Sequence, residues 1–174
     1  MNFPLHPETP PQGVSILELF GGEAARPRLV ESQRRLQQLA RAEGLPLTDR
    51  SMTYNSRLAQ ELGSWATSAG HGRQFHDAVF HAYFVKGQNI YEAAVLADLA
   101  NQAGLDSVAA VQVIATRSWK DSVDREWAAC RNAGITSVPT FEAGGRIVVG
   151  AQPYEELARL VEAAGARKRP VREK

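Results

Sequence analysis

The chain has 174 residues, of which 44% are hydrophobic and 22% are charged. This composition is that of a globular domain, and it excludes a disordered or fibrous chain. The formal net charge is +1, so no overall field attracts nucleic acid or an anionic membrane. No hydrophobic run is long enough to span a bilayer, and the N-terminus MNFPLHPETP lacks a signal-peptide pattern. We therefore expect a cytoplasmic protein that binds neither nucleic acid nor membranes.

Cys130 is the single cysteine of the sequence. One cysteine excludes an intrachain disulfide, a CxxC dithiol and a cysteine-rich zinc site within these residues. It shares a helical face with Val123 and Trp127, which is typical of a small buried hydrophobic residue. We expect a structural thiol, with a reactive thiol as the alternative. Three histidines recur every five residues over 71–81, a spacing that does not place them on one helical face, so we predict no metal site.

The first part of the chain predicts a short extended segment followed by helices. Residues 1–13 are extended up to a proline-rich loop, with a candidate strand over residues 3–6. A short helical turn is expected over 15–20. A longer helix is expected over 27–43, because leucines recur at helical spacing and glycine and proline follow at once.

Further helices are predicted through the middle of the chain. Asn55 is a candidate N-cap for the first of them, and residues 73–86 carry the broad hydrophobic face of the second. Asn89, followed three residues later by a glutamate, resembles the capping box that begins a helix. Asp106 is a candidate N-cap for the next, and a last helix of this region is expected over 118–133.

The pattern changes after residue 134. Residues 135–143 predict a strand entered through Val138-Pro139, and 146–150 predict a returning strand. The Gly144-Gly145 pair between them is a two-residue hairpin signal. Pro153 begins a final helix, and the charged segment 166–174 is expected to be a disordered basic tail.

These blocks resemble a known family. The segments GITSVPTF, GGRIVVGAQ and PYEELARLVEAA are similar to the C-terminal half of a thioredoxin-type fold, and more closely to the DsbA family. The segments FPLHPETPPQG, MTYNSRLAQEL and FHDAVFHAYF are similar to its FrnE-type, 2-hydroxychromene-2-carboxylate-isomerase-like branch. The resemblance covers about residues 1–165.

The resemblance implies an α+β fold in which a thioredoxin-like sheet carries a large helical insertion, as in DsbA. It implies a single domain over 1–165. The thioredoxin-like part comprises 1–13 and 134–165, the helical insertion spans about 27–117, and a connecting helix spans 118–133.

The resemblance also implies a site and an activity. In the family, a CxxC dithiol, or a serine in glutathione-dependent isomerases, follows the first strand, and a cis-proline loop facing it binds an extended substrate. The loop residues matching this pattern are Ser137, Val138, Pro139 and Thr140. The region matching the strand–CxxC–helix unit would precede Met1, so we expect an N-terminally truncated, redox-inactive protein resembling a thiol–disulfide oxidoreductase.

Two alternatives remain open. One is a non-enzymatic module that uses the cis-proline strand to bind a peptide or a second copy of itself. The other is a glutathione-dependent isomerase-like protein, and glutathione is then the one cofactor expected. The partners implied are a thiol or disulfide protein, an extended peptide, or the twin chain in a homodimer.

Loss of the first strand would leave a gap in the sheet beside the strand that follows Pro139. Unpaired backbone groups there are costly when buried and prone to pairing when exposed. Three resolutions are predicted as alternatives. The natural protein contains the missing unit, residues 2–6 move into the vacant position, or a second copy fills it.

Overall fold

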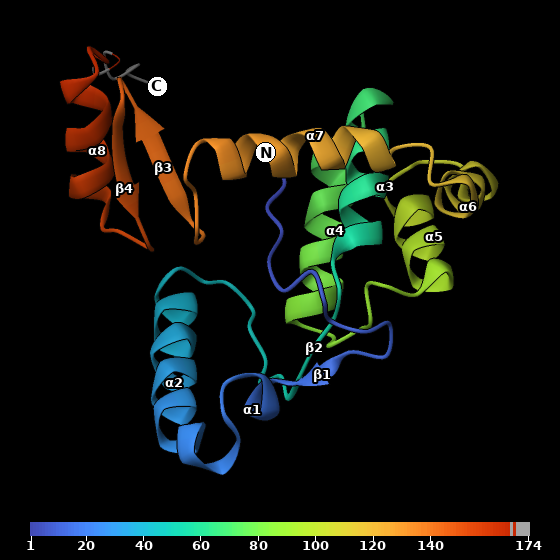
Figure 1. Ribbon diagram of the computed structural model, residues 1–174, viewed down its shortest axis with the longest axis horizontal. Helices are drawn as coiled ribbons and strands as arrows, with labels where there is room; N and C mark the ends of the chain where they lie inside the picture. Colours follow the sequence, from blue (N-terminus) through green and yellow to red (C-terminus); the bar gives the residue numbers. More distant parts are fainter. Residues whose placement is uncertain (168, 170–174) are drawn as a thin grey trace. The chain divides into compact units, whose positions relative to one another are not determined.

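The computed structural model describes residues 1–167 and 169 (Figure 1). The chain divides into two compact units, one of residues 2–126 and the other of Met1 with the residues from 127 onward. The boundary between the units falls within helix α7 (Lys120–Asn132). The single domain over 1–165 stays a prediction, and the tail over 166–174 lies largely outside the described residues.

Helices dominate the larger unit (Figure 1). In chain order its elements are β1 (Val14–Ser15), α1 (Ile16–Leu19), the 3-10 turn η1 (Gly22–Ala25), α2 (Arg26–Ala42), β2 (Met52–Thr53), α3 (Arg57–Ser68), α4 (Gly72–Phe84), α5 (Ala93–Gln102) and α6 (Ser107–Thr116). The helices predicted over 15–20 and 27–43 are thereby confirmed. Helices α3 to α6 pack against one another, and their facing hydrophobic residues form one core. Phe75, Leu62 and Leu96 are almost completely buried in it.

The helix starts agree with the sequence in part. Asp106 caps α6 as predicted, because its Oδ1 accepts the backbone N–H of Val108 at 2.8 Å. The prediction that Asn89 begins α5 is wrong, since that helix starts at Ala93. Asn89 instead accepts the N–H of Tyr91 in a turn before the helix.

Asn55 orders two segments at once. The N-cap position of α3 belongs to the next residue, Ser56, but the side chain of Asn55 accepts the N–H of Arg57 at 2.9 Å. Its amide nitrogen donates to the carbonyls of Pro7 and Thr9, both at 2.9 Å. This one side chain therefore satisfies backbone groups at the helix start and in the N-terminal loop.

The strand predicted over residues 3–6 is wrong. The segment is irregular and then turns, with His6 at a positive φ of 49°. A side-chain amide takes part of the role of a neighbouring strand, since Gln60 Nε2 donates to the carbonyl of Phe3 at 3.1 Å. Residues 2–6 do not pair with β3, because β3 pairs with β4 alone among the described strands.

A short ladder ties the N-terminal segment to the middle of the chain. Strand β1 pairs antiparallel with β2, with Val14 opposite Thr53. Gly13, just before β1, has a φ of +83°, and a Cβ atom there would lie 2.4 Å from the ring of Tyr54. Both the backbone conformation and the close approach therefore require glycine.

The smaller unit is built from a hairpin and one helix. Strand β3 (Thr140–Ala143) pairs with β4 (Arg146–Val149), and α8 (Tyr154–Ala163) packs against both strands. Gly144 and Gly145 both have positive φ, which confirms the predicted two-residue turn. The first strand is shorter than predicted. In the described residues the strands form two separate two-stranded sheets, in place of the single sheet expected.

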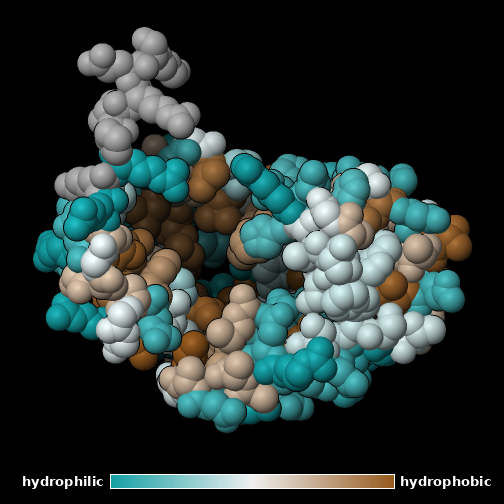
Figure 2. Space-filling view, turned by 90° about the horizontal axis from the view of Figure 1, so that it is seen from above, coloured by the Kyte–Doolittle hydropathy of each residue, from teal (hydrophilic) through white to brown (hydrophobic). Residues whose placement is uncertain are grey.

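The smaller unit leaves much hydrophobic surface uncovered. Its buried hydrophobic side chains, within the described residues, are Cys130 and Leu160. Exposed hydrophobic side chains are more numerous: Met1, Val138, Ile147, Val149, Tyr154 and Val161. Figure 2 shows hydrophobic residues in brown among hydrophilic ones at the molecular surface. A hairpin with one helix buries little, so this unit has surface available for a further element or partner.

Candidate functional site

The four residues predicted as a binding loop lie together at the entrance to β3. The Val138–Pro139 peptide bond is cis, in agreement with the resemblance. The loop is closed by Thr140 Oγ1, which donates to the carbonyl of Ser137 at 2.7 Å. The N–H of Gly150 donates to the carbonyl of Pro139 at 2.8 Å. The loop therefore continues the hairpin. One hydrogen bond within the loop holds it, and a second joins it to Gly150 directly after β4.

The register of the hairpin determines which edge of β3 is open. Thr140 lies opposite Val149, and Glu142 lies opposite Ile147. Hydrogen-bonded and non-hydrogen-bonded pairs alternate in an antiparallel ladder. Since Pro139 and Gly150 form a bonded pair, the pairs of Thr140 and Glu142 are non-bonded. The backbone N–H and C=O groups of these two residues therefore face away from β4.

This outer side of β3, with its Thr140 and Glu142 backbone groups, is called the β3 edge below. Within the described residues, no strand pairs with it. Val138, at the start of the loop, is 46% exposed. An edge with free donors and acceptors next to a hydrophobic side chain is suited to adding an extended strand.

Cys130 lies near the C-terminal end of α7 and is only 3% exposed. Its Sγ lies 3.2 Å from Sδ of Met1. This position is that of a packed side chain, as the helical spacing predicted.

In the part of the chain that the structure describes, no group of three histidine, cysteine or acidic side chains is arranged to hold a metal ion. No helix of the described residues is both long and hydrophobic enough to cross a membrane.

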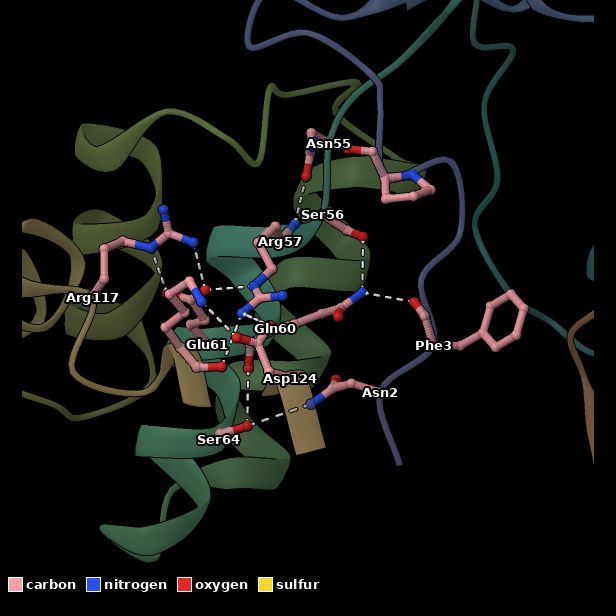
Figure 3. A network of polar contacts seen from close by, with 12 residues as sticks. Asn2, Phe3, Asn55, Ser56, Arg57, Gln60, Glu61, Ser64, Arg117 and Asp124 are labelled. Atoms are coloured by element: carbon pink, nitrogen blue, oxygen red, sulfur yellow. Dashed lines mark hydrogen bonds and ion pairs between the residues drawn. The ribbon is translucent and has the colours of Figure 1, made fainter. Parts of the chain in front are cut away.

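A buried ion-pair network in the larger unit was not predicted from the sequence (Figure 3). The side chain of Glu61 is 4% exposed and lies between two arginines. Arg117 donates to both of its oxygens, from Nε at 2.7 Å and from Nη2 at 2.6 Å. Arg57 donates from Nε at 2.5 Å and also binds Asp124 at 2.7 Å. The network joins α3, the end of α6 and the start of α7.

The charge of Glu61 is stabilised by these partners. Burial by itself would raise the pKa of this carboxyl, but hydrogen bonds from Arg117 and Arg57 outweigh burial, and the pKa lies below its usual value. The spacing of Arg57 and Glu61 at i and i+4 was a visible signal in the sequence. Arg117, the left-handed residue that ends α6, is 56 positions away from Glu61, and no local pattern connects them.

Comparisons with known proteins agree with this fold. A probable DsbA oxidoreductase from Streptomyces coelicolor has a crystal structure that matches with a TM-score of 0.78 and 22% sequence identity, over 94% of this chain and 75% of that one. At this identity the match is evidence for the fold alone. The uncharacterized protein YwbO from Bacillus subtilis is 35% identical over 96 residues, which are 54% of this chain and 48% of that protein. The match thus spans about half the length of this relative.

A family model extends this result to nearly the whole sequence. The model of the DSBA-like thioredoxin domain matches residues 1–162. The match includes both units of the structure, with the Val138–Pro139 loop and the hairpin that follows it. The chain therefore belongs to the DSBA-like thioredoxin domain family.

Proposed function

We propose that this chain binds an extended segment of a thiol- or disulfide-containing protein along the β3 edge. The observation that carries the proposal is the pair of outward-facing backbones at Thr140 and Glu142, next to the exposed loop at Val138. An added strand gains backbone hydrogen bonds there, and its side chains lie next to the exposed side chain of Val138. Family membership supports this use of the loop, since the match to the DSBA-like thioredoxin domain includes the Val138–Pro139 loop and β3.

Within the family, the blocks at the N-terminus and around α3 and α4 favour the FrnE-type branch. We assign the chain to that branch as part of the same proposal. The assignment rests on the segments FPLHPETPPQG, MTYNSRLAQEL and FHDAVFHAYF.

We further propose that the 174-residue chain does not itself exchange disulfides. Exchange within a dithiol requires a second thiol to resolve the mixed disulfide, and this sequence contains one cysteine, which is buried. In the dithiothreitol-driven reduction of insulin, we expect the chain to leave the uncatalysed rate unchanged, and Cys130→Ser to behave in the same way. A faster reaction with the chain than with Cys130→Ser would contradict this.

Glu142→Pro tests the β3 edge directly. Proline removes the outward N–H of this residue but no bond to β4, because the pair with Ile147 is non-bonded. With reduced, carboxymethylated α-lactalbumin as an unfolded probe, we expect Kd to rise about tenfold, the effect of losing about one hydrogen bond and its strand alignment. Binding is measured by fluorescence anisotropy of the labelled probe.

Two variants serve as matched controls for this experiment. Glu142→Ala removes the same carboxylate but keeps the N–H, and Ile147→Pro removes an N–H from the opposite edge, on β4. Both are expected to bind the probe within about twofold of the original chain, a difference of less than ~0.5 kcal/mol. Absence of probe binding, or an equal loss in all three variants, would overturn the proposed site.

Self-association competes for the same edge. If two copies paired antiparallel through β3, with Phe141 opposite its counterpart, Thr140 of each would face Glu142 of the other and no like charges would meet. Size-exclusion chromatography over a range of concentrations separates the two uses. A dimer that dissociates in Glu142→Pro but not in Glu142→Ala would assign the edge to a second copy in place of a foreign peptide.

A further inference from the structure

The larger unit contains a cavity that is separate from the β3 edge. Its volume is about 490 Å³, within the range of small-molecule sites. It is lined from three directions, by the segment of β1 and α1, by the first turns of α2, and by residues 49–51 before β2. The residues of the proposed peptide site take no part in it.

The walls of the cavity are aliphatic and incompletely packed. Ile16, Leu29 and Val30 contribute to the lining, and Val30 is 50% exposed. Helix α2 buries none of its residues, although its leucines follow the pattern of a packed helix. A helix of this pattern gains stability by covering its hydrophobic face, and a ligand with an apolar body would provide such cover here.

Arg50 brings a cation to the lining of this cavity. Its guanidinium stacks over the rings of Tyr83 at 4.2 Å and Phe84 at 4.7 Å, which fix its plane. Its Nη1 atom is buried without a hydrogen-bond partner among the described residues. A buried donor without a partner is costly, so an acceptor at this point would be strongly favoured.

The other charged side chains of the lining already have partners. Arg26 donates from Nε to Glu23 at 2.6 Å. Asp49 accepts from the amides of Gln33 and Gln37, each at 2.6 Å. The lining thus holds an acidic side chain beside Arg50, so a ligand with one negative charge suits the cavity better than a ligand with two.

We propose that the cavity binds a small aliphatic monocarboxylate. The carboxylate accepts hydrogen bonds from the Arg50 guanidinium, for which it is the natural planar acceptor. The hydrocarbon chain lies against Ile16, Leu29 and Val30 and covers the first turns of α2. The site neither uses nor requires Cys130 or the β3 edge.

Octanoate is the probe that tests this site, by isothermal titration calorimetry. We expect Arg50→Gln to weaken octanoate binding by about tenfold or more, which corresponds to ~1.4 kcal/mol. Arg28→Gln is the matched control. Arg28 lies exposed on α2, whose first turns line the cavity, but Arg28 itself does not line it. This variant should leave the affinity unchanged. 1-Octanol, which lacks the charge, should bind more weakly than octanoate to the original chain and equally to both variants.

A second measurement keeps the proposal testable if Arg50→Gln does not fold. In methyl NMR spectra of the original chain, octanoate should shift the signals of Ile16, Leu29 and Val30 and leave those of Ile147 and Val149 in the hairpin unchanged. The proposal is overturned if octanoate produces no heat and no shifts at millimolar concentration, if Arg50→Gln binds it as tightly as the original chain, or if 1-octanol binds as tightly as octanoate.

Discussion

Glu61→Ala is expected to lower the free energy of unfolding by about 3–5 kcal/mol, the typical loss when one partner of a buried ion pair is removed. The change removes the carboxylate that Arg117 and Arg57 share, and Arg57 itself is only 12% exposed. The compensating contact of Arg57 with Asp124 remains, but Arg117 loses both of its hydrogen bonds. Urea unfolding followed by circular dichroism at 222 nm measures the difference.

Glu31→Ala is the matched control for this result. Glu31 pairs with Arg34 at 3.7 Å on the surface of α2, where both side chains are well exposed. Removing an exposed pair is expected to cost less than about 1 kcal/mol. Equal losses for Glu61→Ala and Glu31→Ala would contradict a structural role for the buried network.

The Glu61 network also predicts a pH dependence. Because the pKa of Glu61 is lower in the folded chain than in the unfolded chain, its contribution is complete above the unfolded value of about 4.5. The contribution decreases as the pH falls through the folded pKa, since protonation then removes the charge that both arginines need. The free energy of unfolding of Glu61→Gln should therefore fall less steeply below pH 4.5 than that of the original chain.

Phe75→Ala is expected to destabilise the larger unit by about 3–5 kcal/mol, because it removes a large buried ring and leaves a cavity. Phe75 is 1% exposed, at the contact of α4 with α3. Gly63 of α3 faces its ring, and a Cβ there would lie 3.9 Å from it. A Cβ at that distance would be in ordinary van der Waals contact, so the ring packs directly on this part of α3.

Phe80→Ala provides the comparison on the same helix. Phe80 is 49% exposed and stacks on His76 with the ring centroids 4.2 Å apart. Its removal exposes little new surface, so the expected loss is about 1 kcal/mol or less. Thermal or urea unfolding of the two variants should separate them clearly. Similar losses would mean that the core is centred elsewhere.

The helices could be predicted from the sequence because their signals are local. The hydrophobic spacing in 27–43 and 118–133, and the cap at Asp106, depend on residues within one or two turns. The hairpin was predictable for the same reason, since two glycines specify its turn. The β1–β2 ladder was not, because it joins two-residue strands 38 positions apart (Val14 and Met52 head the two strands) and has no periodic pattern.

In the candidate site, too, the features set by neighbouring residues could be predicted, and those set by residues far apart in the sequence could not. The loop Ser137–Thr140 is contiguous, so its place before a strand followed from a short motif. The open side of β3 depends on the register with β4, which the sequence does not specify in advance. The cavity at Arg50 and the pairing of Glu61 with Arg117 arise from the packing of distant helices. The strand expected over residues 3–6 is absent, and the side-chain amide of Gln60, 57 positions from Phe3, donates to the Phe3 carbonyl where a neighbouring strand was expected.

Amide hydrogen exchange at β3 is the most direct measurement of the proposed function. In the free chain, the outward amides of Thr140 and Glu142 should exchange faster than those of Phe141 and Ala143, which bond to β4. When reduced, carboxymethylated α-lactalbumin is added, we expect new protection at Thr140 and Glu142. Unchanged exchange at both residues with the probe in saturating excess would contradict strand addition at this edge.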